Sequence, residues 1–368
     1  MNLKIALTAL TIAFLTACGG SGSSSSSSST TTTTPVTTPT VLPQLSLYVT
    51  DTESDYSGIA VDTVKSSANY GDVYLQSQVT SGYVYSQPIS LISASKVFTQ
   101  NYGTLADFPT VPGRGAFCAG VYTDPTTGNL YASIVTDTGV GEVCAVSSSG
   151  AISQTPMITF SDFSDEPNYG VISASGNLYV CGNTSVYEVS NLTSSPVVTR
   201  LATNYTFTLP QGITLDSSDN VYVADGDAHV IVEIDHSSGN GTVLAGVANT
   251  ASYVNGAALT ATFNAPLGLA MSADNNLLYI ADSGNNVIRV LNMTTKMVST
   301  IQATVGGDLA INSASAATAN QPVQLYSIAL NTDGNLLIQG GAATGETAIF
   351  TWGTGKSMET SVYLLKLN

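Results

Sequence analysis

Positively charged residues are scarce in this sequence. Its 368 residues include 9 Lys and Arg and 2 His, against 25 Asp and Glu, which gives a formal net charge of −16. Nucleic-acid-binding surfaces need clustered Lys and Arg to contact phosphates, so no nucleic-acid partner is expected. Charged residues of both signs make up only 9% of the chain, about a third of their share in an ordinary soluble domain. Solubility must therefore depend on Ser, Thr, Asn and Gly, which favour strands and turns over exposed helices.

Sequence signatures of common enzymes are absent as well. The chain has no Gly-x-Ser-x-Gly, no His-Glu-x-x-His and no phosphate-binding loop, the motifs of many hydrolases, zinc proteases and nucleotide-binding proteins. Its two histidines, His229 and His236, are too close in sequence to supply a metal site from several parts of a fold. We therefore expect no metal and no cofactor, although the acidity leaves an all-oxygen calcium site open.

The N-terminal apolar run is too short to be a transmembrane helix. It follows Lys4 and extends from Ile5 to Ala17, whereas a helix needs about 20 residues to cross the hydrocarbon core. The positive charge, the apolar stretch and the small residues at its end indicate a signal peptide over residues 1–17. The segment Leu15-Thr16-Ala17-Cys18 resembles the lipobox of bacterial lipoproteins, and this resemblance implies that Cys18 is acylated after cleavage. The alternative is an ordinary secretory signal whose cleavage site contains a cysteine.

Residues 18–44 comprise Cys18 and a linker rich in Ser, Thr and Pro. Seven serines at 23–29 precede five threonines at 30–34, a composition that buries too little apolar surface to fold. We expect a disordered tether. Gly19 follows the cysteine and no Asp is present there, which by resemblance to enterobacterial sorting rules favours the outer membrane. The expected product is a bacterial outer-membrane lipoprotein whose globular domain lies in the periplasm or at the cell surface.

A pattern of two short strands recurs six times in residues 45–368. Each instance has an apolar strand, a polar turn and a second apolar strand, and turns such as Gly128-Asn129 tolerate the positive φ of tight hairpins. The first strands contain Gly58, Gly120, Gly170, Gly212, Gly268 and Ser327. The second strands contain Tyr74, Tyr131, Tyr179, Tyr222, Tyr279 and Leu337.

The spacing of these hairpins predicts a β-propeller. Successive second strands are 43 to 58 residues apart, enough for a four-stranded sheet, or blade, in each repeat. The expected fold class is therefore all-β, with six four-stranded antiparallel blades. A β-sandwich is the alternative, but it gives no reason for a repeat of this length. Propellers close by sharing strands from both termini, so residues 45–49 and 362–367 are expected in one sheet or in abutting blades.

The best-matched instances resemble a known family. Residues 210–216 (PQGITLD) continue to 220–225 (NVYVAD), and residues 266–269 (PLGL) continue to 278–289 (LYIADSGNNVIR). These segments look like NHL repeats, whose pattern is P-x-G-I-A-V-D, G-N-V-Y-V-A-D and then N-H-R-I. The resemblance is strong over 205–295 and degenerate over 50–200 and 320–368. It implies a six-bladed propeller but says little about function, since one fold hosts many functions.

Several side chains are candidates for function. Residues just before the innermost strands should reach the mouth of the central channel, and these are Tyr169, Gln211, Leu267 and Tyr326. Asp225 and Asp282 recur at one position of the repeat, which favours capping of turn amides over catalysis. His229 falls on the His of the family pattern and is expected to act in a turn. The recurring tyrosines are expected to pack in the core with a polar tip.

Three cysteines remain after lipidation, namely Cys118, Cys144 and Cys181. Export places them in an oxidising compartment, where an odd number allows at most one internal pair. Cys118 precedes the first strand of one repeat and Cys181 ends the second strand of the next, so both should lie at the same rim. We predict a Cys118–Cys181 disulfide, with three reduced thiols as the alternative. Cys144 alternates with valines and should be buried.

The expected function is that of a lipid-anchored, non-catalytic binding or interaction module of the cell envelope. Its partner would be an envelope or extracellular protein or a glycan, and the domain is expected to be a monomer. The alternative is suggested by six-bladed relatives that are lyases or lactonases and bind a metal on the propeller axis.

The lipid anchor can be tested by fractionation. The substitution Cys18→Ser should move the protein from the membrane fraction to the soluble fraction, because several acyl chains on one residue are enough for stable anchoring. Immunoblotting of the two fractions measures the shift, and Cys144→Ser is the control that should remain with the membrane. A Cys18→Ser protein that stays in the membrane fraction would show that the anchor lies elsewhere.

Overall fold

The computed structural model describes most of the region that the sequence assigns to the propeller. The described residues are 44–51, 55–78, 89–95, 98–103, 117–136, 140–153, 155–160, 167–301, 304–305, 308–309, 322–342 and 360–367. The predicted signal peptide, Cys18 and the linker up to residue 43 lie outside them. Residues 41–368 form one compact unit. Within the described ranges, no helix has the length and apolar character needed to cross a membrane.

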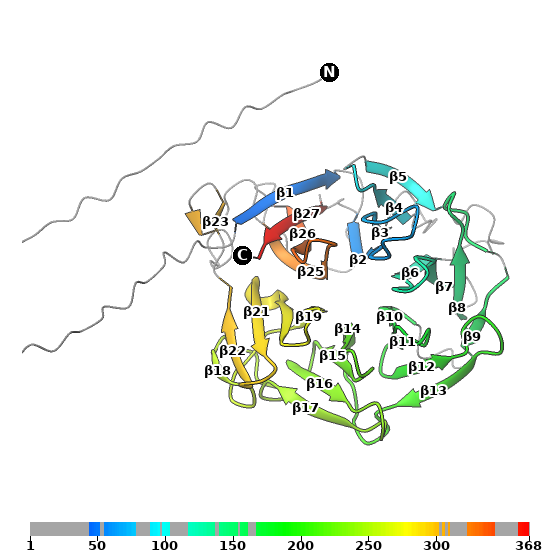
Figure 1. Cartoon of the computed structure of the whole chain (residues 1–368). Coiled ribbons are helices and arrows are strands. Elements are labelled where there is room, and N and C mark those ends of the chain that lie inside the picture. The colour runs from blue at the N-terminus through cyan, green and yellow to red at the C-terminus, as the bar shows by residue number, and fades with distance from the viewer. Residues whose placement is uncertain are drawn as a thin grey trace, which may run out of the picture. The chain divides into compact units, whose positions relative to one another are not determined.

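The described strands form six sheets arranged as a ring (Figure 1). Four of them have four antiparallel strands in chain order, as predicted. The first has β2 (Asp55–Val61), β3 (Val73–Gln78), β4 (Ile89–Ile92) and β5 (Phe98–Gly103). The second has β6 (Phe117–Thr123), β7 (Leu130–Val135), β8 (Gly141–Val146) and β9 (Ile158–Phe160). The third has β10 (Gly170–Ile172), β11 (Leu178–Cys181), β12 (Val186–Ser190) and β13 (Val197–Leu201). The fourth has β14 (Pro210–Leu215), β15 (Val221–Asp225), β16 (Val230–Ile234) and β17 (Gly241–Ala245).

The fifth sheet is larger than predicted. It contains β19 (Pro266–Met271), β20 (Leu277–Asp282), β21 (Val287–Asn292) and β22 (Met297–Thr300), with the 3₁₀ helix η1 (Ser283–Asn285) between β20 and β21. A short fifth strand, β18 (Gly256–Ala257), pairs with the outer edge of β22. The expectation of four strands was wrong here because the long segment before β19 folds back and covers an edge that would otherwise be open.

The sixth sheet joins the two ends of the propeller region. Its order is β24 (Asp308–Leu309), β23 (Thr304–Val305), β1 (Gln44–Asp51), β27 (Thr360–Lys366), β26 (Leu336–Ala342) and β25 (Pro322–Leu330). β1 runs antiparallel to β27, with Leu45 opposite Leu365, and β27 pairs in turn with β26. The prediction that residues 45–49 and 362–367 share a sheet is confirmed. The prediction of four strands was wrong for this sheet as well, because the closing sheet also contains β23 and β24.

The inner strands meet around a common axis. Each one contacts the next in a closed circuit, in the order β2, β6, β10, β14, β19, β25 and again β2. A glycine on the inner strand makes the approach possible. A Cβ on Gly212 would lie 2.0 Å from the carbonyl oxygen of Leu267, and a Cβ on Gly120 would lie 2.1 Å from that of Asn168. Any side chain at these two positions would force the neighbouring blades apart.

The hydrophobic core lies between neighbouring sheets. One cluster joins Tyr222 and Ile231 of the fourth sheet to Leu269 of the fifth. The recurring tyrosines at 74, 131, 179, 222 and 279 are at most 7% exposed, which confirms their predicted packing role. Their tips remain polar, since the hydroxyls of Tyr179 and Tyr222 donate to Glu188 and Glu233 across the sheet. Burial, together with these carboxylates, raises the pKa of both tyrosines.

Closure by β1 and β27 can be tested by truncation. Deleting residues 358–368 removes β27 from between β1 and β26, so the sixth sheet is interrupted and an edge is exposed. We expect the cooperative thermal unfolding transition, followed by circular dichroism, to be lost. A matched deletion of residues 23–33 removes a similar length of Ser and Thr and should leave the transition unchanged. Unchanged unfolding of the C-terminal truncation would contradict a ring closed by β27.

Candidate functional site

A narrow cavity lies on the propeller axis where the glycines of the inner strands meet. Its volume is about 60 Å³, and its lining includes Gly120, Gly212 and Gly268. Three of the four residues predicted at the channel mouth, Tyr169, Leu267 and Tyr326, line this cavity from separate blades. The fourth, Gln211 on β14, is half-buried and is not among its lining residues. The sequence therefore located residues that come together, although whether they bind a ligand stays a prediction.

A wider cavity of about 290 Å³ lies towards the ends of the inner strands. The residue after each glycine, or after Ser327 in the sixth sheet, contributes one aliphatic side chain to its lining. These six residues, here called the aliphatic collar, are Ile59, Val121, Val171, Ile213, Leu269 and Ile328. Val61, Met271 and Leu330 continue the apolar wall two residues further along their strands. The sequence held a signal for this collar, because the residue after the repeated small residue is Ile, Val or Leu in every repeat.

Polar side chains are a minority among the residues that line the wider cavity. Thr63, Thr123 and Thr214 are among its lining residues, and the Thr123 hydroxyl donates to the carbonyl of Val61 at 2.8 Å. Among the described residues that line either cavity, none is an Asp, Glu, His, Cys, Lys or Arg. The aliphatic side chains of the lining can bind an apolar group, and the hydroxyls of Tyr, Thr and Ser are its side-chain groups for hydrogen bonding.

The repeated aspartates hold the segments that lead into the inner strands. Asp225 accepts hydrogen bonds from the amides of Thr208 and Leu209 and from the Thr208 hydroxyl. Asp282 accepts from the amide of Asn264 at 2.7 Å. The predicted amide-capping role is confirmed, although the amides belong to the preceding segment and not to the turn itself. His229 adopts the positive φ of a turn, and its Nδ1 accepts from the amide of Ala265.

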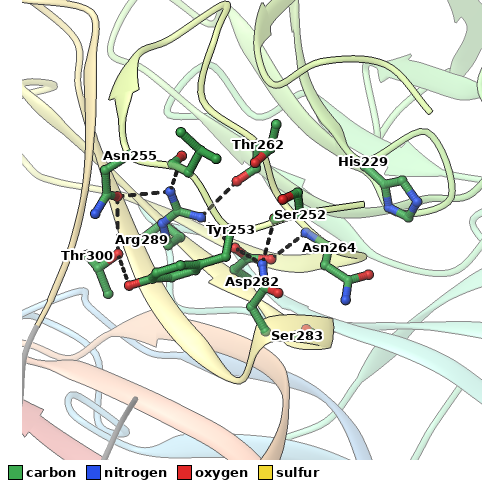
Figure 2. A network of polar contacts seen from close by, with 12 residues as sticks. His229, Ser252, Tyr253, Asn255, Thr262, Asn264, Asp282, Ser283, Arg289 and Thr300 are labelled. Atoms are coloured by element: carbon green, nitrogen blue, oxygen red, sulfur yellow. Dashed lines mark hydrogen bonds and ion pairs between the residues drawn. The ribbon is translucent and has the colours of Figure 1, made fainter. Parts of the chain in front are cut away.

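A buried arginine, Arg289, was not identified as a structural residue from the sequence. Its side chain is fully buried on β21 and pairs with Asp282 at 2.8 Å. Arg289 also donates to the carbonyls of Thr262 and Val254 and to Asn255 Oδ1 (Figure 2). Burial raises the pKa of Asp282, while hydrogen bonds from Asn264, Asn285 and Arg289 act in the opposite direction.

Aromatic rings complete this network. The guanidinium carbon of Arg289 lies 4.8 Å from the centre of the Tyr253 ring and 5.1 Å from that of Phe263. Figure 2 shows the Tyr253 ring beside the guanidinium, with its hydroxyl donating to Thr300. Cation–π contacts and charge-assisted hydrogen bonds together fix the segment before β19 against the fifth sheet. Because Arg289 is buried and its partners belong to the chain, its role is structural.

The cysteines lie on neighbouring sheets. Cys144 on β8 is fully buried, which confirms its predicted environment, and burial together with Glu142 raises the pKa of its thiol to about 12. Cys181 is buried on β11, and its amide donates to the carbonyl of Tyr169. The side chain of Cys118 on β6 lies outside the described residues, so the Cys118–Cys181 disulfide stays a prediction. Across the described ranges, no group of three or more His, Cys, Asp or Glu is placed to hold a metal ion.

The arginine network can be tested by substitution. Arg289→Met leaves the Asp282 carboxylate buried without its counter-charge, which should lower the free energy of unfolding by about 3–5 kcal/mol. Arg200 on β13 is exposed, so Arg200→Met is the control. It should change the free energy of unfolding by less than about 0.5 kcal/mol. Urea titration measures both. Equal effects for the two variants would show that the buried pair does not hold the segment.

Comparison with known proteins agrees with this geometry. Residues 263–291, which include β19, η1, Asp282 and Arg289, match the family described as NHL repeat. NHL repeat-containing protein 2 of Bos taurus is 41% identical over 91 residues, which cover 24% of this chain and 12% of that protein. Its Homo sapiens counterpart is 40% identical over 93 residues, which cover 25% of this chain and 13% of that protein. The chain thus matches only a small part of the length of these curated relatives.

Solved structures extend the similarity to the whole propeller. A structural genomics protein of unknown function from Bacteroides thetaiotaomicron has a TM-score of 0.58 and 17% identity, covering 88% of this chain and 76% of its own. An auxiliary nutrient binding protein from the same species has a TM-score of 0.55 and 15% identity. The match covers 87% of this chain and 76% of that chain. A streptogramin B lyase structure has a TM-score of 0.51 and 14% identity. The match covers 89% of this chain and 98% of that chain. The chain is therefore an all-β propeller of small, mainly antiparallel sheets that carries an NHL repeat at residues 263–291.

Proposed function

We propose that the chain is a six-bladed NHL-type propeller that binds a ligand on its axis without catalysing a reaction. The observation that carries this proposal is the aliphatic collar, which gives every inner strand an apolar side chain towards the axis. Such a lining favours binding by burial of apolar surface. Catalysis would require positioned acid, base, nucleophile or metal-ligand groups, and the described cavity linings hold no carboxylate, imidazole, thiol or amine side chain.

The solved structures offer precedents for both binding and catalysis. One similar chain is described as an auxiliary nutrient binding protein. The second candidate function is that of an axial-metal lyase or lactonase, which is favoured by the similarity to a streptogramin B lyase structure. A metal on the axis needs carboxylate, imidazole or amide ligands from several blades. None of the six residues of the aliphatic collar carries such a ligand group.

The sequence supports an anchor for this domain in the cell envelope. The lipid on Cys18 and the Ser- and Thr-rich tether hold the propeller at the bacterial outer membrane, in the periplasm or at the cell surface. There it acts as a monomeric binding module for an envelope or extracellular protein or a glycan. Its net charge of −16 makes binding to nucleic acid unfavourable.

Metal analysis of the purified, tag-free protein separates the two candidate functions. We expect no stoichiometric divalent ion, and we expect EDTA dialysis to leave the thermal unfolding temperature unchanged, because the described axial lining lacks strong metal ligands. Protein dialysed against buffer without EDTA is the control. One tightly bound divalent ion per chain, together with EDTA-sensitive lactone opening, would overturn the binding proposal in favour of the enzyme.

A further inference from the structure

Exposed apolar side chains are concentrated on one blade of the propeller. Among the residues that the structure describes, seven large hydrophobic side chains are exposed, and five of them lie between residues 247 and 297. Four of these five, here called the edge patch, are Tyr253, Val254, Leu259 and Met297. Single exposed apolar residues are ordinary, whereas a group of them marks an interaction surface.

The edge patch forms because the segment before β19 folds back on β22. Ala257 of β18 is opposite Met297 of β22, and Leu259 follows two residues after Ala257. Further along the same edge, the Tyr253 hydroxyl donates to Thr300 Oγ1 at 3.0 Å. Figure 1 shows β18 and β22 on the outside of the ring. The patch is therefore remote from the axial cavities and belongs to a different surface.

The Arg289 network holds this segment in place. The Arg289 guanidinium donates to the carbonyl of Val254 and lies 4.8 Å from the centre of the Tyr253 ring (Figure 2). The side chains of Tyr253 and Val254 nevertheless remain 43% and 47% exposed. A surface that is already ordered loses little conformational entropy when it docks on a partner.

Negative charge is scarce around the edge patch, although the chain has 25 Asp and Glu. None of them occurs at residues 236–273 or 283–307. Of the two between these ranges, Asp282 is buried and paired with Arg289, and Asp274 lies in the turn between β19 and β20. Lys296 directly precedes Met297 and adds a positive charge beside the patch. This region can therefore approach a negatively charged surface with less repulsion than the rest of the acidic chain.

The predicted tether enters the propeller close to the edge patch. Gln44 begins β1 and is opposite Thr304 of β23. Thr304 is only four residues after Thr300, the hydrogen-bond partner of Tyr253, and four residues span at most about 14 Å. A flexible chain with the length of the predicted linker has an end-to-end distance of roughly 28 Å. A lipid on Cys18 would therefore keep the patch close to the membrane surface.

We infer that the edge patch docks on the phospholipid surface of the membrane that holds the lipid anchor. Its apolar side chains lie at the boundary between headgroups and acyl chains, where Tyr is also favoured, and Lys296 faces the headgroups. The inference goes beyond axial ligand binding and rests on the proposed anchor at Cys18. A few apolar side chains bind a membrane weakly, but the tether raises their effective concentration at the surface.

Fluorescence quenching measures contact between the patch and the acyl chains. The protein is extracted from bacterial membranes in detergent and reconstituted into phosphatidylcholine and phosphatidylglycerol vesicles, with and without bromine on the acyl chains. We expect bromine to quench the fluorescence of Leu259→Trp, because this side chain reaches the acyl boundary. Val198→Trp on β13, which is also exposed, is the matched control and should not be quenched. The native chain, whose only tryptophan is Trp352, gives the background signal.

A negative charge in the patch should prevent docking. In the Leu259→Trp protein, Met297→Glu should lower the ratio of docked to undocked molecules at least about tenfold, because a carboxylate without a partner resists leaving water. Val197→Glu on β13 in the same background is the control and should leave the quenching unchanged. Thermal unfolding verifies that both variants fold. If Met297→Glu is misfolded, Val254→Glu provides the same measurement.

The outcomes separate docking from anchoring. Leu259→Trp protein that floats with the vesicles but is quenched no more than Val198→Trp would overturn docking and leave the anchor intact. Protein that does not float with the vesicles would contradict both. A dimer of the Cys18→Ser protein in sedimentation velocity, dissociated by Met297→Glu, would assign the patch to a second copy of the chain and overturn membrane docking.

Discussion

The inner strands approach one axis closely because five of the six carry a glycine, and the sixth the small Ser327, where neighbouring strands meet. At Gly212 the space for a Cβ is already taken by the carbonyl oxygen of Leu267, and at Gly120 by that of Asn168. Steric exclusion at these positions, more than any attractive contact, sets the radius of the ring. The interfaces between sheets can then be filled by the tyrosines and aliphatic residues of the second and third strands.

The same constraint fixes what the axis can hold. Where the strands are closest, little more than the volume of a few water molecules remains. The residue after each repeated small residue lines the wider cavity, and it is aliphatic in all six sheets. Polar networks are found instead at the periphery, as with Arg289 and Asp282, where they attach segments between blades to the sheets.

Much of this architecture could be predicted from the sequence, because it depends on local and repeated patterns. The glycine and tyrosine of the first five hairpins marked the inner two strands, and the alternating segments at both ends indicated the shared sheet. The fifth strand β18 could not be found, because Gly256 and Ala257 have no strand pattern and pair only after the chain folds back. Arg289 could not be recognised as buried, because its partners Val254, Asn255 and Thr262 lie some 30 residues earlier. The residues of the aliphatic collar could be recognised in the sequence as an Ile, Val or Leu after each repeated small residue. Their place in the axial cavity could be assigned only once the innermost strands were known.

The pairing of β1 with β27 also determines the order in which the molecule can fold. Gln44 is opposite Lys366, so the first strand of the propeller must wait for nearly the whole chain before it finds its partner. Pairings this distant in sequence carry a large loop-closure entropy and slow the folding of β proteins. The first four sheets are built from strands that are consecutive in the chain, as are β19 to β22 of the fifth, so they can form as the chain emerges. Until β27 has been synthesised, the sheets made of consecutive strands can form only an open arc, and pairing of β27 with β1 and β26 closes this arc into a ring.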